Sequence, residues 1–286
     1  MTDFKPLRSV LYMPSSNERA LEKAKSIPAD AIIFDLEDAV APDAKVEARG
    51  MAAAAVTSGE YGGRHLIIRV NGIGTEWHAD DIKAAAVAGP DVVLVPKVNS
   101  ADEVLELVDE LAAAGAPPKT KLWAMVETPI GMLNALSIAT ASERLTGFVM
   151  GTNDLVKELY AEHVPGRQPV LTGLGLALLA ARAAGIVIID GVYNDVKNID
   201  GFLAEVEQGR QMGFDGKTLI HPGQVDGAND GFAPSAQAVE EARGLIEAFE
   251  SSTGGVVTYN GKMVENLHVE SAKRTLAIND AILALS

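Results

Sequence analysis

Apolar residues gather in eight short runs along the chain, and the segments between them are rich in helix-forming residues with helical spacing. Most runs are continuous rather than alternating, which is typical of parallel strands covered on both faces. The predicted strands span residues 9–14, 31–38, 65–71, 92–98, 121–127, 145–151, 187–193 and 215–221. The clearest helices predicted between them span residues 17–26, 43–56 and 102–114.

Eight strand–helix units in series predict an α/β fold, a (β/α)₈ TIM barrel. An open, doubly wound sheet is the structural alternative. It is disfavoured because no glycine-rich dinucleotide fingerprint follows the first predicted strand. The chain has 286 residues, and a barrel of this type needs about 250, so the sequence holds more than the barrel alone.

The chain continues past the eighth predicted strand. We predict a helix over residues 235–252, a glycine-rich break at 253–255, a short segment at 256–259, a turn at Asn260 and Gly261, a second short segment at 263–264, and a last helix over 269–285. The sequence thus divides into a barrel, residues 1–233, and a C-terminal helical extension or lid, residues 234–286. About 50 residues are too few for an independent core, so we expect the extension to pack on its own barrel, pack on a neighbouring subunit, or act as a lid.

Composition narrows the possible functions. The formal net charge is −15, and such a surface repels nucleic-acid phosphate and anionic lipid. The chain has no cysteine, which excludes disulfides, thiolate metal sites and a cysteine nucleophile. It shows neither an apolar run of about 18–20 residues nor the pattern of a signal peptide. We therefore expect a cytoplasmic protein that binds neither nucleic acid nor membrane.

An anionic substrate would need a local positive cluster to override this field. The candidates are Arg69 and four basic residues near the N-terminus, Arg8, Arg19, Lys23 and Lys25.

Polar residues close most of the predicted strands, and function in a TIM barrel collects at those ends. These residues are Asp35, Glu37, Asp38, Arg69, Asn71, Lys97, Glu127, Asp154, Asp190, Tyr193, Asn194 and His221. Crowded carboxylates repel one another, and a divalent cation relieves that repulsion. Oxygen ligands favour a hard ion, Mg²⁺ or Mn²⁺, over zinc.

Glu127 and Asp154 follow two successive predicted strands and are the predicted metal ligands. Mg²⁺ commonly takes one or two protein carboxylates and completes its shell with water and substrate oxygens. The alternative is a structural role, in which either carboxylate caps a helix or pairs with Lys97 or Arg69.

Arg69 lies in an otherwise apolar predicted strand, and a buried arginine must be paired. It either forms a structural ion pair with Asp35 or Glu37, or grips a carboxylate or carbonyl of the substrate. Strand alternation would send Asp35 and Glu37 to one side and Asp38 to the other. We expect Glu37 or Asp38 to hydrogen-bond metal-bound water.

His221 is ambiguous, because a lone histidine at a strand end often bonds to the backbone. Its alternative is a place in the substrate site.

The runs SVLYMPSSNERALEKA, IIFDLEDAV, IIRVNG, AMVETPIGMLN, MGTNDL and KTLIHPGQV resemble the citrate lyase β-subunit-like family of HpcH/HpaI aldolases. That family includes malyl-CoA lyases, citramalyl-CoA lyases and malyl-CoA thioesterases. The resemblance covers nearly the whole chain in order. The stretches TGLGL, DGVYN, GFDGKTLIHP and VENLH are most similar to the malyl-CoA thioesterase branch.

The resemblance implies roles for residues at matching positions. Glu127 and Asp154 would ligate Mg²⁺, with Mn²⁺ as a possible substitute, and Arg69 would bind the acyl portion. Asn153 and Asp154 would touch the substrate. Coenzyme A would lie against a further set, Tyr12, Arg19, Lys23, Ile220 and His221.

In lyases of the family the C-terminal segment closes over a neighbouring subunit's barrel and supplies an aspartate. The matching position here is Glu265, which reaches one methylene further. The resemblance therefore implies a homo-oligomer, a trimer or hexamer, with a shared site. The expected catalytic residues are Glu265, Arg69, Asp38 and Glu37.

The implied function is Mg²⁺-dependent hydrolysis of (3S)-malyl-CoA to malate and CoA. We expect the longer reach of Glu265 to favour attack by water. The alternatives are C–C cleavage by a malyl-CoA, β-methylmalyl-CoA or citramalyl-CoA lyase, giving glyoxylate or pyruvate plus an acyl-CoA, a non-catalytic CoA-ester binding protein, and an aldolase acting on free acids.

Overall fold

The computed structural model describes residues 5–251 and 257–285. Its chain forms two compact units. One covers Leu7–Phe232, and the other covers the residues from Ala233 onward together with those before Leu7. None of the helices in the described ranges is both long and apolar enough to cross a membrane.

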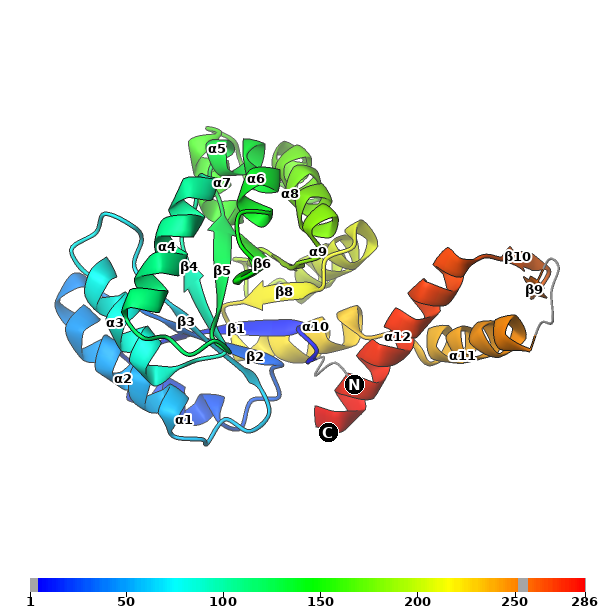
Figure 1. The fold of residues 1–286 in the computed structure, drawn as a ribbon, viewed down its shortest axis with the longest axis horizontal. Coiled ribbons are helices and arrows are strands. Elements are labelled where there is room, and N and C mark those ends of the chain that lie inside the picture. Colours follow the sequence, from blue (N-terminus) through cyan, green and yellow to red (C-terminus); the bar gives the residue numbers. More distant parts are fainter. Residues whose placement is uncertain (1–4, 252–256, 286) are drawn as a thin grey trace. The chain divides into compact units, whose positions relative to one another are not determined.

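The first unit is a closed barrel of eight parallel strands, in which each strand pairs with the next and β8 pairs with β1 (Figure 1). The predicted TIM barrel is therefore confirmed. The strands are β1 Ser9–Pro14, β2 Ala31–Asp35, β3 His65–Arg69, β4 Val92–Val95, β5 Lys121–Val126, β6 Leu145–Met150, β7 Val187–Asp190 and β8 Gly216–Leu219.

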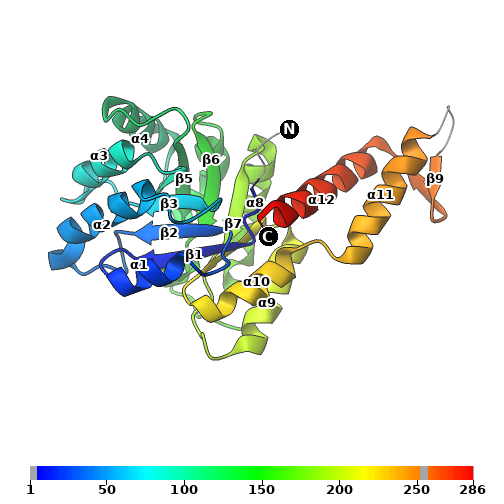
Figure 2. The ribbon, with the colours of Figure 1, turned by 90° about the horizontal axis from the view of Figure 1, so that it is seen from below.

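Helices cover the outside of the barrel, and α1, α2 and α3 lie outside β1–β3 in Figure 2. The helices are α1 Glu18–Ala24, α2 Lys45–Thr57, α3 His78–Ala88, α4 Ala101–Ala113, α5 Pro129–Leu133, α6 Ala135–Ala139, α7 Thr152–Glu158, α8 Leu171–Ala184, α9 Ile199–Met212 and α10 Val225–Phe232, with short 3₁₀ turns η1 Pro42–Ala44, η2 Gln168–Val170 and η3 Pro222–Gln224. Side chains of Asn17 and Ser100 cap α1 and α4 by accepting hydrogen bonds from backbone N–H groups.

Two apolar layers explain why the strands are continuously apolar. In β2, Ala31 and Ile33 belong to the cluster that fills the barrel, whereas Ile32 and Phe34 pack in the cluster shared with the helices. Successive side chains of a strand point to opposite faces, so both faces must be apolar. The inner cluster holds Leu7, Val10, Ala31, Ile33, Ile67, Val92, Leu94, Trp123, Met125, Val149 and Ile189.

Several strands are shorter at their C-terminal ends than predicted. β2 ends at Asp35, β3 at Arg69, β4 at Val95, β7 at Asp190 and β8 at Leu219. The polar residues that follow leave the sheet to contact other loops. The apolar pattern located the strands, but it could not show where the sheet hydrogen bonds stop.

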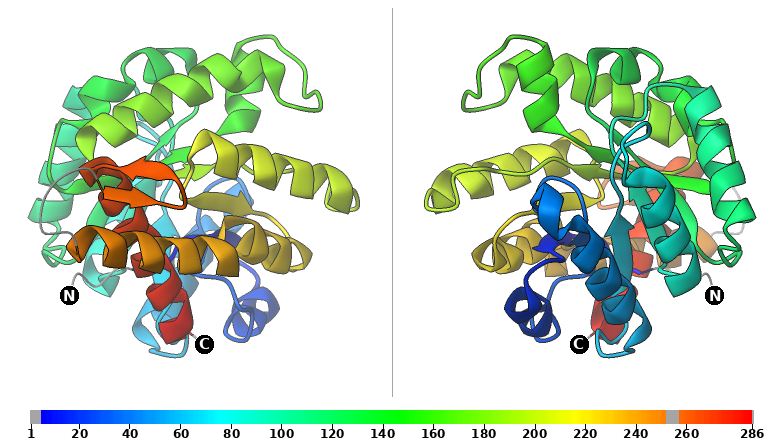
Figure 3. Two further views of the ribbon diagram at one scale, coloured as in Figure 1. Left: turned by 90° about the vertical axis from the view of Figure 1, so that its right-hand side faces the viewer. Right: turned by 90° about the vertical axis from the view of Figure 1, so that its left-hand side faces the viewer.

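The second unit contains two helices joined by a β-hairpin. Helices α11 Ala236–Glu250 and α12 Asn266–Leu285 pack on each other, and β9 Val257–Tyr259 pairs antiparallel with β10 Lys262–Val264 (Figure 3, left). Asn260 and Gly261 both have positive φ, as the predicted turn requires. Helix α12 begins three residues before its predicted start. The predicted break at 253–255 and the predicted ends Ser252 and Val256 lie outside the described residues.

A buried cluster of charged side chains connects β7 and β8 to helix α9. Asp190 accepts hydrogen bonds from Arg167 Nη1 at 2.6 and 2.8 Å and from Lys217 Nζ at 3.1 Å. Lys217 also donates to Glu205 Oε1 on α9 at 2.7 Å. Asp190 and Lys217 are fully buried, so neither charge has access to water.

Asp190→Asn is expected to lower the free energy of unfolding by about 3–5 kcal/mol, because it leaves two buried cations short of one negative charge. Urea unfolding, followed by the fluorescence of Trp123 inside the barrel, measures the change. Asp80→Asn, at an exposed position, is the control and should change stability by less than about 0.5 kcal/mol. A similar small loss for Asp190→Asn would show that the cluster does not hold the barrel together.

Candidate active site

Polar residues replace the apolar ones in the last inward-facing layer of the barrel. Inward-facing Val10, Ile33, Ile67 and Met125 are followed two residues later by Tyr12, Asp35, Arg69 and Glu127. Alternation directs both members of each pair to the same side of the sheet. The carboxyl ends of the strands therefore carry one ring of charged and polar side chains.

Arg69 is enclosed by carboxylates. Its Nε and Nη2 donate to the two oxygens of Asp35 at 2.6 Å each, and Nη1 lies 2.7 Å from Glu37 Oε2 and 3.5 Å from Asp38 Oδ2. The guanidinium also stacks over the Tyr12 ring, 4.8 Å from its centroid. The structural ion pair considered from the sequence is therefore present, and Nη1 is the edge turned toward the loop carboxylates.

The expected separation of Asp38 from Asp35 and Glu37 is wrong. All three carboxylates approach Arg69, because β2 ends at Asp35 and the alternation rule does not extend into the turn that follows.

Glu127 is almost fully buried, and its carboxylate occupies a space that the absence of a side chain at Gly151 leaves open. Its Oε1 accepts a hydrogen bond from the backbone N–H of Lys97 at 2.8 Å. A Cβ at Gly151, at the end of the next strand, would collide with Glu127 Oε2. Glycine is thus required at position 151 for the carboxylate to sit where it does.

Asp154 lies in the first turn of α7, directly after β6. Lys97 Nζ is 3.9 Å from Asp154 Oδ1 and 3.2 Å from Glu37 Oε1. Lys97 therefore contacts both predicted metal ligands, one through its backbone and one through its side chain.

The donor set fits a hard cation. Glu127 and Asp154 offer only carboxylate oxygens, which is what Mg²⁺ prefers. Within residues 5–251 and 257–285, no group of three or more acidic, histidine or cysteine side chains is arranged to hold a metal. In a site built on Glu127 and Asp154, water and substrate oxygens would complete the shell of the ion.

Burial raises the pKa of Glu127 to about 7. Lys97 opposes the shift, and the negative charges of Glu37 and Asp154 add to it. Burial also raises the pKa of Glu37 and of the Tyr12 phenol above their usual ranges. Burial thus disfavours the charged forms of Glu127 and Glu37, which is the electrostatic condition that a bound cation would relieve.

The other predicted site residues lie around this ring. Asn153 exchanges two side-chain hydrogen bonds with Asn194, at 2.7 and 3.2 Å. Arg19 and Lys23 are exposed on α1. Ile220 and His221 follow β8, and His221 Nδ1 accepts from the backbone N–H of Gly223 at 3.0 Å, which is the backbone role considered from the sequence.

Two of the basic candidates are engaged elsewhere. Arg8 pairs with Asp30 at 2.8 Å, before the first residues of β1 and β2 and so at the opposite end of the barrel. Lys25 pairs with Glu22 and Glu60. Neither is placed to bind a substrate at the polar ring.

Glu265 belongs to the second unit. It is exposed between β10 and α12, and its backbone N–H donates to His268 Nδ1 at 3.0 Å.

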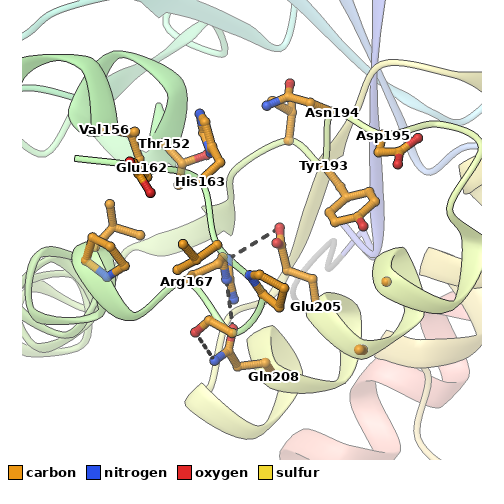
Figure 4. A pocket seen from close by; sticks show the side chains of 18 of the residues that line it. Thr152, Val156, Glu162, His163, Arg167, Tyr193, Asn194, Asp195, Glu205 and Gln208 are labelled. Atoms are coloured by element: carbon orange, nitrogen blue, oxygen red, sulfur yellow. Dashed lines mark hydrogen bonds and ion pairs between the residues drawn. The ribbon is translucent and has the colours of Figure 1, made fainter. Parts of the chain in front are cut away.

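A further cavity, of about 420 Å³, lies beside α9 and the loops that follow α7 and β7 (Figure 4). Its lining includes Arg167, whose Nε donates to Gln208 Oε1 at 2.8 Å. Thr152 and Asn194 also line it. The cavity therefore borders the first residue of α7, next to Asn153, and the loop after β7, and its lining does not include Glu127 or Asp154.

The family model described as HpcH/HpaI aldolase/citrate lyase matches residues 8–222. The chain belongs to this family. A second model, for a C–C bond lyase of the TIM-barrel fold, matches residues 169–280, and so includes most of the C-terminal extension.

Relatives in the HpcH/HpaI family carry different activities. The chain is 54% identical to the (3S)-malyl-CoA thioesterase of Cereibacter sphaeroides (strain ATCC 17025), over 98% of this chain and 96% of the relative. It is 39% identical to citrate lyase subunit beta of Escherichia coli (strain K12), over 94% and 92%. The family resemblance and its closeness to the thioesterase branch are confirmed.

Solved structures agree with the fold. CitE of Mycobacterium tuberculosis, in complex with magnesium, acetoacetate and coenzyme A, matches with a TM-score of 0.78 and 28% identity, over 96% of this chain and 98% of that chain.

Sequence reasoning missed three contacts in the site. It named Lys97 as part of the ring but not its N–H bond to Glu127, and it did not foresee the stack of Arg69 on Tyr12 or the pairing of Asn153 with Asn194. Alternation could have placed Tyr12 and Arg69 in one layer. The left-handed backbone of Lys97 has no signal in the sequence, because lysine rarely adopts it.

Glu127→Gln is expected to stabilise the metal-free protein at pH 8 and to leave it almost unchanged at pH 5. A raised carboxyl pKa means that the stabilising neutral form is present below about pH 4.5 and is lost as the pH rises through about 7. The full shift corresponds to about 3 kcal/mol.

Thermal unfolding in EDTA at both pH values measures this effect, with exposed Glu143→Gln as the matched control. An equal change in melting temperature at pH 5 and pH 8 would contradict the burial argument.

Proposed function

We propose that this protein hydrolyses (3S)-malyl-CoA to malate and CoA in a Mg²⁺-dependent reaction. The observation that carries the proposal is the 54% identity to a (3S)-malyl-CoA thioesterase over 98% of the chain. The carboxylate pair at the barrel mouth supports it, because it supplies the oxygen ligands that such a reaction needs.

Glu127 and Asp154 would hold the Mg²⁺. When bound, the ion polarises substrate oxygens and stabilises the negative charge that develops during reaction. CitE of M. tuberculosis holds magnesium together with coenzyme A, which supports the same choice of ion here, and Mn²⁺ has the same ligand preferences.

Arg69 would bind the acyl portion through Nη1. Its other donors are occupied by Asp35. Nη1 also lies 2.7 Å from Glu37, and its 3.5 Å contact with exposed Asp38 is weak enough to be exchanged for a substrate oxygen. Glu37 and Asp38 would hydrogen-bond water near the ion. The Asp35–Arg69 pair thus orients the guanidinium, and the loop carboxylates adjust around the substrate.

Coenzyme A would lie across the edge formed by β1 and β8. These strands are paired in the closed barrel, so the loop residues after β8, Ile220 and His221, adjoin the segment that begins at Tyr12. Exposed Arg19 and Lys23 on α1 supply the positive charge that phosphates require. Asn153 would contact the substrate from the β6–α7 turn.

In the hydrolysis, water attacks the thioester carbonyl carbon, the C–S bond breaks, and the CoA thiol leaves with a proton. We assign the general base to Glu265, delivered to the barrel of another subunit by the C-terminal extension. This assignment requires a homo-oligomer, a trimer or hexamer with a shared site. A cytoplasmic location is consistent with a CoA substrate and a chain without cysteine.

Incubating the protein with (3S)-malyl-CoA and Mg²⁺ should release malate and CoA, detected by mass spectrometry. Glu127→Gln and Asp154→Asn should each lower kcat/KM at least about 100-fold, because each removes a charged ligand of the ion. Glu143→Gln, at an exposed position, is the control. Glyoxylate in place of malate would overturn the thioesterase proposal, and CoA-ester binding without turnover would indicate a binding protein.

Lyase activity is the second candidate, because the match to the C–C bond lyase model continues through residue 280. In that route a base removes the hydroxyl proton of the acyl group and the C–C bond breaks. Both routes use the same carboxylate pair. We propose that the longer side chain of Glu265 favours water attack.

Glu265→Asp is therefore expected to raise the ratio of glyoxylate to malate from malyl-CoA, because a misplacement of about 1 Å can change a proton-transfer rate roughly 100-fold. Glu265→Gln should lower both products. The two product ratios can be measured in one mass-spectrometric assay. An unchanged ratio in Glu265→Asp would show that this residue does not select the reaction.

A further inference from the structure

Lys97 has a backbone conformation that lysine seldom adopts. Its φ is 54°, in the left-handed region. Non-glycine residues persist there when surrounding contacts demand it, and such residues cluster at functional sites. For Lys97 one such contact is the hydrogen bond that its backbone N–H donates to Glu127 Oε1, at 2.8 Å.

The side chain of Lys97 lies near two other carboxylates of the site, Glu37 and Asp154. Its ammonium lies 3.2 Å from Glu37 Oε1 and 3.9 Å from Asp154 Oδ1. Lys97 is partly exposed, with 43% of its side-chain surface accessible. The ammonium can therefore move toward Glu37 and solvent without unpacking the core.

The charges at the ring explain why an ammonium is needed there. Two cations, Arg69 and Lys97, share the ring with five carboxylates, which are Asp35, Glu37, Asp38, Glu127 and Asp154. Arg69 is already enclosed by the first three of these carboxylates. Lys97 supplies the positive charge at Asp154.

We propose that Lys97 is a positioning residue for Glu127 through its backbone and lowers the Mg²⁺ affinity of the site through its ammonium. Its backbone N–H fixes Glu127, and its ammonium acts as a resident counter-ion that holds Asp154 and Glu37 until Mg²⁺ binds. Because the ammonium and Mg²⁺ have charges of the same sign, Lys97 competes with the ion for Asp154 and retreats to Glu37 when the ion arrives. This inference rests on the Mg²⁺ ligands of the proposed function.

The role of the Lys97 ammonium can be tested by the direction in which its removal changes the affinity for Mg²⁺. Removing the ammonium removes a repulsion of the bound ion, so Mg²⁺ should bind more tightly, although the ion-free site is less well neutralised. A residue with a purely structural role would do the opposite, because its loss would disorder the ligands and weaken binding. At low ionic strength we expect Lys97→Met to lower the Kd for Mg²⁺ about three- to tenfold.

The test is calorimetric titration of the EDTA-treated, full-length protein with MgCl₂ alone. Lys97→Met and Lys97→Gly both delete the charge, and glycine also accepts the left-handed backbone without strain, so both should bind Mg²⁺ more tightly. Lys97→Arg keeps the charge and should bind like the unmodified protein. Lys83→Met, which removes an exposed lysine on α3, should leave the Kd unchanged.

Equal or weaker Mg²⁺ binding by both charge-deleting variants would overturn the role of Lys97 while leaving the proposed function intact. Absence of Mg²⁺ binding by the unmodified protein would overturn the metal ligands themselves, and the role of Lys97 with them. Raising the ionic strength should reduce the difference between Lys97→Met and the unmodified protein, and a difference that ignores salt would also count against the counter-ion.

Discussion

The ion pair between Arg69 and Asp35 is the interaction on which the mouth of the barrel depends. A buried guanidinium must be neutralised and hydrogen-bonded, because leaving either charge alone would cost several kcal/mol. Asp35 takes two donors, Glu37 and Asp38 approach the third nitrogen, and Tyr12 covers the face. The C-terminal parts of β1, β2 and β3 and the loop after β2 thereby meet at Arg69. These carboxylates neutralise the charge of Arg69, so little positive charge is left at that edge of the ring.

The opposite edge of the ring is left with surplus negative charge. Buried Glu127 accepts a hydrogen bond from the backbone N–H of Lys97, whose ammonium pairs with Glu37 and Asp154, and burial raises the pKa of Glu127. Gly151 keeps the space open although any other residue would fill it. Such a carboxylate weakens the fold without an ion, and it becomes favourable when a cation binds. The same feature that costs stability is the one that defines the site.

The two units of the chain contribute different parts of the proposed chemistry. In our proposal the barrel supplies the carboxylate pair and the acyl-binding arginine, and the chain is similar to relatives with a hydrolytic and with a lyase name. The carboxylates therefore do not select between hydrolysis and C–C cleavage, since both reactions build negative charge on oxygens near the ion. That selection falls to a proton-transferring group, for which Glu265 in the extension is our candidate.

The sequence by itself determined the eight strands, their order, the closed barrel and the polar residues at the ends of most strands, because apolar periodicity and strand–helix alternation are local signals. It also placed Glu127 and Asp154 directly after two successive strands. Only the tertiary structure decided where each strand ends, and so brought Asp38 beside Asp35 against the alternation rule. It alone decided that Lys97 takes a left-handed backbone, because that conformation arises from a hydrogen bond to a residue thirty positions away. Contacts of this kind are set by the closure of the barrel, which no local pattern encodes.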